Sequence, residues 1–284
     1  MAQFTNQATL TYNNTVVNSN VAVGELLEVL SATKLAVVDS YTQGDDVTYI
    51  ISILNSGNTP ITGISVSDDL GAYAVGGTTV TPLSYVDGSI RLYAGGVLQA
   101  SPTTTAGPPL VFGGITIPAK SNVMLVYETR TNGFAPPNVT GSLTNTATIT
   151  GGGLTTPVLA ESVITPRSAP NLTITKSLEP TVVAENGTLT YRFVIQNFGN
   201  TAAETTDAVA VTDTFSPVLS GIMVMLNGAT LAEYTDYTYD ETTGVFATIP
   251  GQITIPAATF TQDPTTGAFV TTPGAVTLAV TGTV

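Results

Sequence analysis

The sequence predicts an all-β protein built from two tandem antiparallel β-sandwiches. Two observations lead to this fold class: short segments in which apolar and polar residues alternate, and turn residues that bound them. Asp46–Leu54 alternates and stops at an Asn-Ser-Gly-Asn turn, and Leu189–Ile195 alternates and stops at Asn-Phe-Gly-Asn. Many short strands with turn signals at roughly 8–12 residue spacing are typical of antiparallel sandwiches.

An internal repeat indicates that the chain contains two copies of one Ig-like domain. A repeat of this length is the sequence signature of a duplicated structural unit. Five anchors recur in the same order, namely Lys34 with Lys176, Tyr49 with Tyr191, Asp68 with Asp213, Ile115–Ala119 with Ile253–Ala257, and Val123–Tyr127 with Val276–Val280.

The two copies differ at their ends. The first continues into Leu143–Ile149 (LTNTATI), a good final strand, whereas the second stops at Val284 without a counterpart of it. A similar segment, Phe4–Leu10 (FTNQATL), stands at the start of the chain. We therefore expect residues 1–28 to be a donor strand and linker, 29–166 to be the first domain, and 167–284 to be a second domain that lacks its last strand.

An incomplete sandwich exposes its core and unpaired edge groups, and a strand supplied from outside relieves both costs. Donor-strand complementation supplies such a strand. The pattern predicts that residues 2–12 of one subunit complete the second domain of the next, with Phe4, Asn6, Ala8 and Leu10 in the donor strand. The partner is then another copy of the chain, and a head-to-tail contact that does not close produces a filament. In the alternative, the strand closes its own second domain, and the protein is a monomeric adhesin or glycan-binding module.

The spacing T-K, G-D-x-x-T-Y, N-x-G-N, V-x-D and T-N-x-A-T resembles the Ig-like repeat of bacterial and archaeal surface proteins. The second copy departs from it at Gly187-Thr188-Leu189, which is one residue shorter before its Thr-Tyr pair. An acidic protein with two such repeats also looks like the main appendage proteins of clostridial endospores. The resemblance implies a structural or adhesive role on a cell or spore surface, with no cofactor and no catalytic turnover.

Three residue types at repeated positions suggest a self-formed isopeptide bond. Lys34 and Lys176 lie on a first strand, Asp68 and Asp213 on a middle strand, and Asn145 and Asn6 on the final or donor strand. Burial favours a neutral, nucleophilic lysine, and a protonated Asp can polarise the Asn amide. The expected bonds join Lys34 to Asn145 within the first domain and Lys176 to Asn6 between subunits, with Asp68 and Asp213 assisting. The plainer interpretation is that Lys snorkels from an edge strand, while Asn and Asp hold turns.

Two other site types remain open. The pairs Asp45-Asp46 and Asp68-Asp69 could supply oxygen ligands to calcium, although the spaced D-x-D-x-D-G pattern is missing. An aromatic surface for glycans could be formed by five tyrosines, namely Tyr85, Tyr93, Tyr234, Tyr237 and Tyr239. Tyrosines in a sandwich more often half-bury their rings and leave the hydroxyl in water.

Composition excludes several function classes. The net charge of −13 argues against nucleic-acid binding. With no His and no Cys, the usual catalytic triads and zinc sites are absent, and we expect no enzyme, metal or cofactor.

No apolar run approaches the roughly 18–20 residues that span a bilayer. No Sec signal is visible after Met1. Charged residues make up only 10% of the chain. So weakly charged a surface suits a subunit that is largely covered by other copies of itself. We expect an extracellular location.

Overall fold

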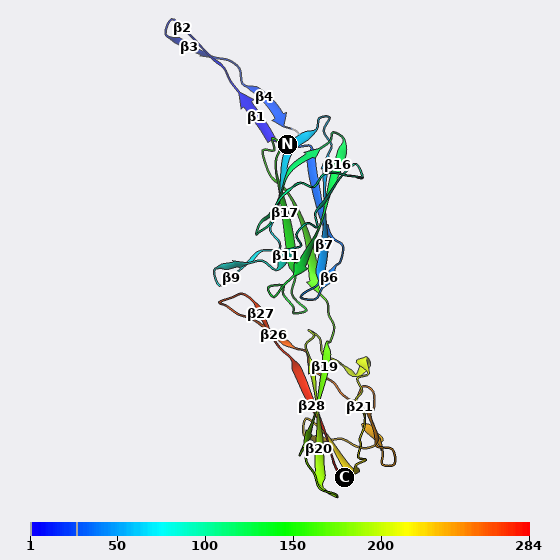
Figure 1. Ribbon diagram of the computed structural model, residues 1–284. Coiled ribbons are helices and arrows are strands. Elements are labelled where there is room, and N and C mark those ends of the chain that lie inside the picture. The colour runs from blue at the N-terminus through cyan, green and yellow to red at the C-terminus, as the bar shows by residue number, and fades with distance from the viewer. Residues whose placement is uncertain (1, 27) are drawn as a thin grey trace.

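The computed structural model describes residues 2–26 and 28–284 and confirms the all-β prediction. Antiparallel pairing dominates, and the described residues contain a single short 3₁₀ helix, η1 (Thr205–Asp207). None of them forms a helix long and apolar enough to cross a membrane. Figure 1 shows an elongated molecule with a projecting N-terminal hairpin, a first β-sandwich unit and a second unit, in that order.

The first unit packs two six-stranded sheets face to face. One sheet has the order β13-β12-β16-β7-β5, with β11 also paired to β16, and the other has the order β14-β15-β8-β17-β18-β6. The strands of the first sheet are β13 (Val97–Leu98), β12 (Arg91–Ala94), β16 (Ser121–Thr131), β7 (Asp46–Asn55), β5 (Leu30–Ala36) and β11 (Leu83–Tyr85). The strands of the second are β14 (Thr103–Thr105), β15 (Leu110–Ile117), β8 (Ile61–Asp68), β17 (Leu143–Gly151), β18 (Val158–Pro166) and β6 (Ser40–Tyr41). A small hairpin, β9 (Tyr73–Val75) with β10 (Thr78–Val80), leaves the sandwich at the end nearer the second unit.

The second unit repeats the first sheet and shortens the other. Its larger sheet has the order β23-β22-β28-β20-β19, which matches β13-β12-β16-β7-β5 strand for strand. These strands are β23 (Ala229–Thr230), β22 (Ser220–Leu226), β28 (Gly274–Thr283), β20 (Thr188–Asn197) and β19 (Leu172–Glu179). The facing sheet contains only β21 (Thr212–Thr214), β25 (Val245–Thr248) and β24 (Tyr237–Asp240).

Each unit has its own hydrophobic core, made by the alternate residues that point inward from the facing sheets. In the first unit Phe112 contacts the rings of Tyr127 and Tyr85, with centroids 5.3 and 6.0 Å away. In the second unit Phe215 stacks on Tyr191 at 4.9 Å. The two cores agree with the repeat in the sequence.

One repeated turn explains why the N-x-G-N anchor occurs in both copies. Asn55 ends β7, and its buried side chain accepts a hydrogen bond from Gly57 N–H and donates to Pro118 O. Asn197 ends β20 and makes the same two contacts, with Gly199 N–H and Pro256 O. A buried Asn amide that serves the backbone of two connections fixes how the sheets meet at this end of each unit.

The main difference between the units lies beside β8 and its counterpart β21. In the first unit β17 pairs with β8, and β18 pairs with β17. In the second unit β21 pairs with β25 on one side only, and the described residues contain no counterpart of β17 and β18 there. One edge of the second unit is therefore unpaired.

The N-terminal residues form a two-stranded hairpin, which differs from the expected strand and linker. β1 (Ala2–Asn6) pairs with β4 (Ala22–Leu26), and β2 (Thr9–Tyr12) pairs with β3 (Thr15–Asn18). The two residues at the tip, Asn13 and Asn14, both have positive φ, as a type I′ turn requires. Within the segment expected to be linker, β3 and β4 pair with the first arm, because these residues alternate in the manner of a strand.

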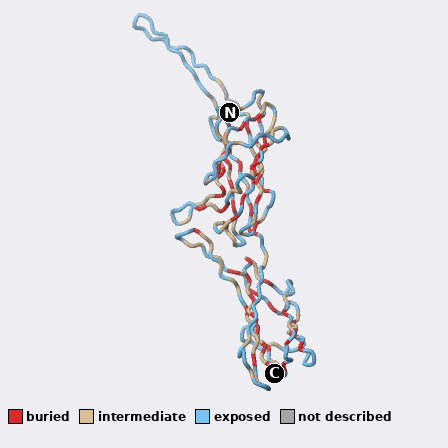
Figure 2. The backbone as a smooth tube through the Cα atoms, in the orientation of Figure 1, coloured by how far each residue is buried: buried red, intermediate tan, exposed pale blue. Residues whose placement is uncertain are grey.

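Figure 2 shows that the hairpin is exposed over almost its whole length and projects from the end of the first unit opposite the second unit. The N-terminal strand thus lies far from the second unit of its own chain. An isolated two-stranded hairpin is only marginally stable in water.

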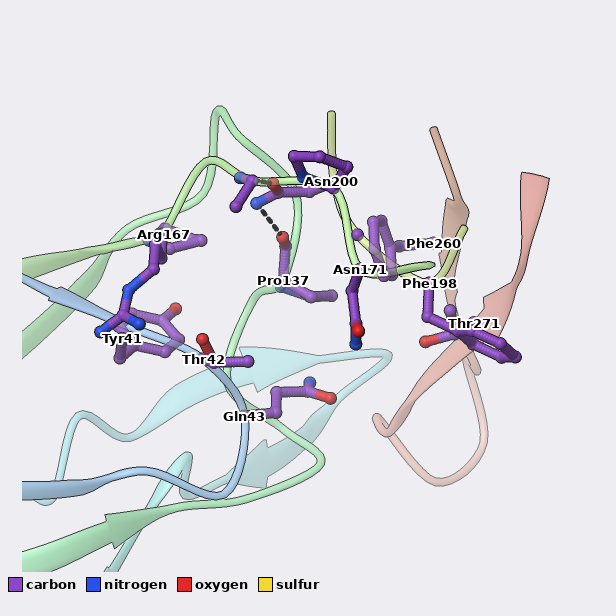
Figure 3. A pocket seen from close by; sticks show the side chains of 14 residues that line it. Tyr41, Thr42, Gln43, Pro137, Arg167, Asn171, Phe198, Asn200, Phe260 and Thr271 are labelled. Atoms are coloured by element: carbon purple, nitrogen blue, oxygen red, sulfur yellow. Dashed lines mark hydrogen bonds between the residues drawn. The ribbon is translucent and has the colours of Figure 1, made fainter. Parts of the chain in front are cut away.

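The joint between the units is held by contacts from both sides. A hairpin from the second unit, β26 (Thr259–Gln262) with β27 (Phe269–Thr272), reaches the first unit, where Gln262 Nε2 donates to Tyr73 Oη at 2.8 Å. Asn200 Nδ2 donates to Pro137 O at 2.9 Å, as Figure 3 shows. A cavity of about 420 Å³ at this joint is lined by residues of both units. These contacts set the two units end to end.

Candidate functional site

Strands β5, β8 and β17 bring Lys34, Asp68 and Asn145 together in the first unit. Lys34 points inward from β5, and its Nζ lies 2.6 Å from Asp68 Oδ2, with both side chains inaccessible to solvent. Ala147 of β17 lies opposite Asp68, which places Asn145 two residues earlier on the same inward face. All three polar residues belong to the buried interior.

Burial controls the chemistry of this cluster. It lowers the pKa of the Lys34 ammonium, and the nearby Asp68 carboxylate offsets this only in part. The Nζ atom also lies 5.0 Å from the centroid of the Tyr49 ring. Burial thus favours the neutral amine of Lys34, and Asp68 Oδ2 lies within hydrogen-bond distance of its Nζ.

Two tyrosines that the sequence analysis did not assign to the site complete it. Tyr127 Oη donates a hydrogen bond to Asp68 Oδ2, and the Tyr49 ring stacks on Tyr127 at 5.9 Å. Burial, followed by the negative charge of Asp68, raises the pKa of both hydroxyls. Tyr127 therefore remains a hydrogen-bond donor to Asp68 Oδ2, which also accepts a hydrogen bond from Lys34 Nζ.

Two members of the cluster have buried polar atoms that lack a hydrogen-bond partner of acceptable geometry. They are the Nδ2 and Oδ1 atoms of Asn145 and the Oη atom of Tyr49. The amide lies near the Tyr49 and Tyr127 hydroxyls, whose pKa it lowers slightly against the larger effect of burial. An unsatisfied buried amide costs roughly 1–3 kcal/mol per group, so its position calls for a chemical reason.

The second unit repeats half of this cluster in an open form. Lys176 of β19 and Asp213 of β21 form an ion pair, but their side chains are 40% and 18% exposed, against 0% for both partners in the first unit. Lys176 Nζ lies 4.4 Å from the centroid of the Tyr191 ring, as Lys34 lies over Tyr49. Val280 occupies the repeat position of Tyr127, so the second site has no matching tyrosine hydroxyl.

Strand β19 is more exposed than its counterpart β5. In β5, Leu30, Lys34 and Ala36 are buried. In β19, Leu172, the counterpart of Leu30, is 37% exposed, and Ile174, the counterpart of the half-buried Ala32, is 53% exposed. Apolar side chains at a sheet edge that are open to water form a surface that another element can cover.

The hairpin exposes residues whose sequence pattern resembles that of β17. Phe4 and Leu10 are 59% and 63% exposed, and Asn6 and Ala8 are exposed as well. Their counterparts in β17 are all buried, namely Leu143, Asn145, Ala147 and Ile149. Asn6 is therefore not brought to Lys176 and Asp213 within one chain, whereas Asn145 is brought to Lys34 and Asp68.

The other candidate residues do not assemble into sites. Asp46 forms a surface ion pair with Arg130, and Asp45 and Asp69 accept hydrogen bonds from turn backbone. No group of three or more possible metal ligands is found within 2–26 and 28–284. The five tyrosines do not form one surface, because Tyr237 and Tyr239 are buried in the second core.

Comparison with known proteins shows a distant likeness in fold. No protein-family model and no curated protein matches the chain. The major pilin subunit BcpA of Bacillus cereus is 12% identical, with a TM-score of 0.34 over 96% of this chain and 73% of the pilin. The pilus backbone RrgB of Streptococcus pneumoniae is 12% identical, with a TM-score of 0.35 over 86% of this chain and 55% of that one.

A third similar structure is the full-length major pilin SpaD of Corynebacterium diphtheriae. It is 11% identical, with a TM-score of 0.36 over 85% of this chain and 58% of the pilin. The chain thus spans little more than half the length of the pneumococcal and corynebacterial proteins. At these identities and TM-scores the three similar structures carry no conclusion about the function of this chain.

Proposed function

We propose that the protein is a structural subunit that assembles head to tail into an extracellular filament on a cell or spore surface. One observation carries this proposal: the second unit lacks the strand beside β21, and the projecting hairpin displays the sequence pattern of that strand. The N-terminal strand of one subunit completes the second unit of the next by donor-strand complementation.

The direction of the hairpin favours donation between subunits. It projects from the end of the first unit that faces away from the second unit, so closure within one chain would require it to turn back along the whole first unit (Figure 1). Donation to a neighbour requires no such reversal. The contact joins unlike ends of the chain, and repetition of such a contact extends in one direction.

The buried cluster of the first unit supports a covalent step. The Lys34 ammonium transfers a proton to Asp68, and the neutral Nζ attacks the Asn145 Cγ atom. Asp68 returns a proton to the departing Nδ2, which leaves as ammonia, and then takes up the proton that Nζ loses as the neutral Nζ–Cγ amide forms. The unsatisfied Asn145 amide and the lowered Lys34 pKa both have a role in this reaction.

The same reaction between subunits would join Lys176 to Asn6, with Asp213 in the place of Asp68. In the isolated subunit Lys176 and Asp213 are open to water. Insertion of the donor strand would take them out of water and supply the amide in one step. The bond would then form only at an assembled junction.

Deletion of residues 2–26 is expected to abolish filament formation and leave a soluble subunit, because the deletion removes the donor and leaves the acceptor intact. Electron microscopy and sedimentation of the purified protein measure the result. The matched control is Asn14→Gly at the hairpin tip, which keeps both arms and a turn with positive φ. Filaments of normal appearance from the deleted chain would contradict strand donation.

The lowered Lys34 pKa predicts a dependence on pH for a chain that cannot form the first bond. In Asn145→Ala, Lys34 remains an amine and binds a proton more readily in the unfolded state, where its pKa is near 10.5, than in the folded state. The free energy of unfolding should therefore rise with pH between the lowered folded-state pKa of Lys34 and its unfolded-state pKa, because only the unfolded state holds the proton there. Above this window ionisation of Tyr49 and Tyr127, whose folded-state pKa is raised, acts in the opposite sense.

Denaturant midpoints at a series of pH values test this expectation. In the native chain the proposed bond makes the Lys34 Nζ an amide nitrogen. An amide nitrogen does not take up a proton in this pH range, so the rise should be absent. Equal slopes for the native chain and Asn145→Ala would show that Lys34 is a free amine in both.

A further inference from the structure

The second unit has two uncovered surfaces, and a single strand covers only one of them. The free edge of β21 corresponds to the edge of β8 that β17 occupies in the first unit. The inward face of β19 corresponds to the face of β5 that β18 covers, where Ala36 N–H donates to Ser162 Oγ at 3.0 Å. Two added strands are therefore needed to cover the second unit as completely as β17 and β18 cover the first.

The N-terminal hairpin has two antiparallel arms, as β17 and β18 do, although its ladder is interrupted between Asn6 and Thr9. Leu10 lies opposite Val17, as Ile149 lies opposite Val158. Cross-strand partners share a face of the sheet. Val17 thus shares the inward face of Leu10, while Val16, opposite Thr11, lies on the outer face.

The outer face of the hairpin also resembles the outer face of β18. Leu159 and Val163 of β18 are 64% and 52% exposed in the complete first unit. Val16 and Val23 of the hairpin occupy the corresponding outer face and are each 61% exposed. An apolar outer face is therefore compatible with the position that we assign to the second arm.

The N-terminal hairpin stands directly before the first unit in the chain, as the β17–β18 hairpin stands directly before the second unit. The β17–β18 hairpin returns through β18, and five residues lead from Pro166 to the start of β19 at Leu172. The β1–β4 hairpin returns through β4, and three residues lead from Leu26 to the start of β5 at Leu30. In both places a two-stranded hairpin is followed at once by the strand that carries the cluster lysine.

From this correspondence we infer that the element donated between subunits is the whole hairpin β1–β4, which inserts both arms into the second unit of another copy of this chain. The inference rests on the strand donation proposed above. The first arm pairs with β21 as β17 pairs with β8, and the second arm covers β19 as β18 covers β5. Each junction then has the complete sandwich of the first unit.

Single cysteines in the full chain test the inference, because the native sequence contains none. The variants Leu10→Cys, on the first arm, and Val17→Cys, on the second, place a thiol on the inward face. The variant Val16→Cys is the matched control on the outer face. The reaction of each thiol with a maleimide is timed in intact filaments and in denatured subunits.

Whole-hairpin donation predicts that Leu10→Cys and Val17→Cys react at least about 10-fold more slowly in filaments than when denatured, with Val16→Cys much less affected. A slow Leu10→Cys with Val17→Cys as fast as Val16→Cys would mean that one strand is donated, which overturns the inference and leaves strand donation standing. A fast Leu10→Cys in filaments would overturn donation itself. If Val17→Cys does not assemble, Ala22→Cys, opposite Asn6, makes the same comparison with Val23→Cys on the outer face.

Discussion

The native subunit is expected to weigh roughly 17 Da less than its sequence requires, because formation of the Lys34–Asn145 bond releases one ammonia. Lys34→Met should restore the mass calculated for its own sequence, since methionine has a similar length and no nucleophilic nitrogen. Asp68→Asn should do the same, because the amide cannot accept the Lys34 proton. Intact-mass measurement of denatured, unassembled protein gives the answer directly.

The chain offers a matched control for this measurement. Lys120 is an exposed lysine whose Nζ donates to Ser56 O, far from the buried cluster. Lys120→Met makes the same chemical change and should keep the deficit of the native chain. A native subunit of full calculated mass, or a deficit that survives Lys34→Met, would remove the first bond from the proposal.

Loss of this bond should also have a large effect on stability. The bond closes a loop of roughly 110 residues, and by the chain-entropy treatment of cross-links such a loop contributes about 4–5 kcal/mol to the free energy of unfolding. For a unit of this size that corresponds to a fall in Tm on the order of 10–20 °C. Calorimetry of Lys34→Met beside Lys120→Met measures it.

Filaments of the native chain are expected to resist boiling in detergent and to give a ladder of multimers, because a Lys176–Asn6 bond would make each junction covalent. Asn6→Ala should still assemble, since the apolar residues of the hairpin remain. Its filaments should nevertheless separate into single subunits on boiling. Lys176→Met should behave in the same way. Denaturing gel electrophoresis of purified filaments distinguishes these results.

The first-unit variants serve as controls for the junction. Asn145→Ala removes the proposed bond within a subunit and should leave the ladder of multimers intact. Native filaments that boil apart into single subunits would show that the junction is held by noncovalent contacts alone. A ladder that persists in Asn6→Ala would place the covalent link at other residues.

Much of the architecture could be predicted from the sequence. Alternating segments that end in turns predicted the all-β fold, since the side-chain period of a strand is two and a buried face must be apolar. The order of five anchors agrees with the matching strand order of the two larger sheets. The role of Asn55 and Asn197 in the N-x-G-N turns emerged only from their hydrogen bonds.

The candidate sites were predictable in part. Lys34, Asp68 and Asn145 could be selected because the chain has few lysines and their repeat positions coincide. Tyr127 was missed because its repeat counterpart is Val280, so nothing in the repeat marked it. Its hydroxyl is found at Asp68 only because β16 and β8 face each other across the core.

The sequence alone determined that short alternating segments end in turns, that five anchors recur in the same order, and that Phe4–Leu10 resembles Leu143–Ile149. These are comparisons of residue order and need no coordinates. Only the tertiary structure decided that residues 15–26 pair with the first arm to form a hairpin, and that the hairpin points away from its own second unit. The pairing and the direction of the hairpin depend on contacts between residues distant in the sequence. The burial of Lys34 and the exposure of Lys176 likewise depend on which strands cover each side chain.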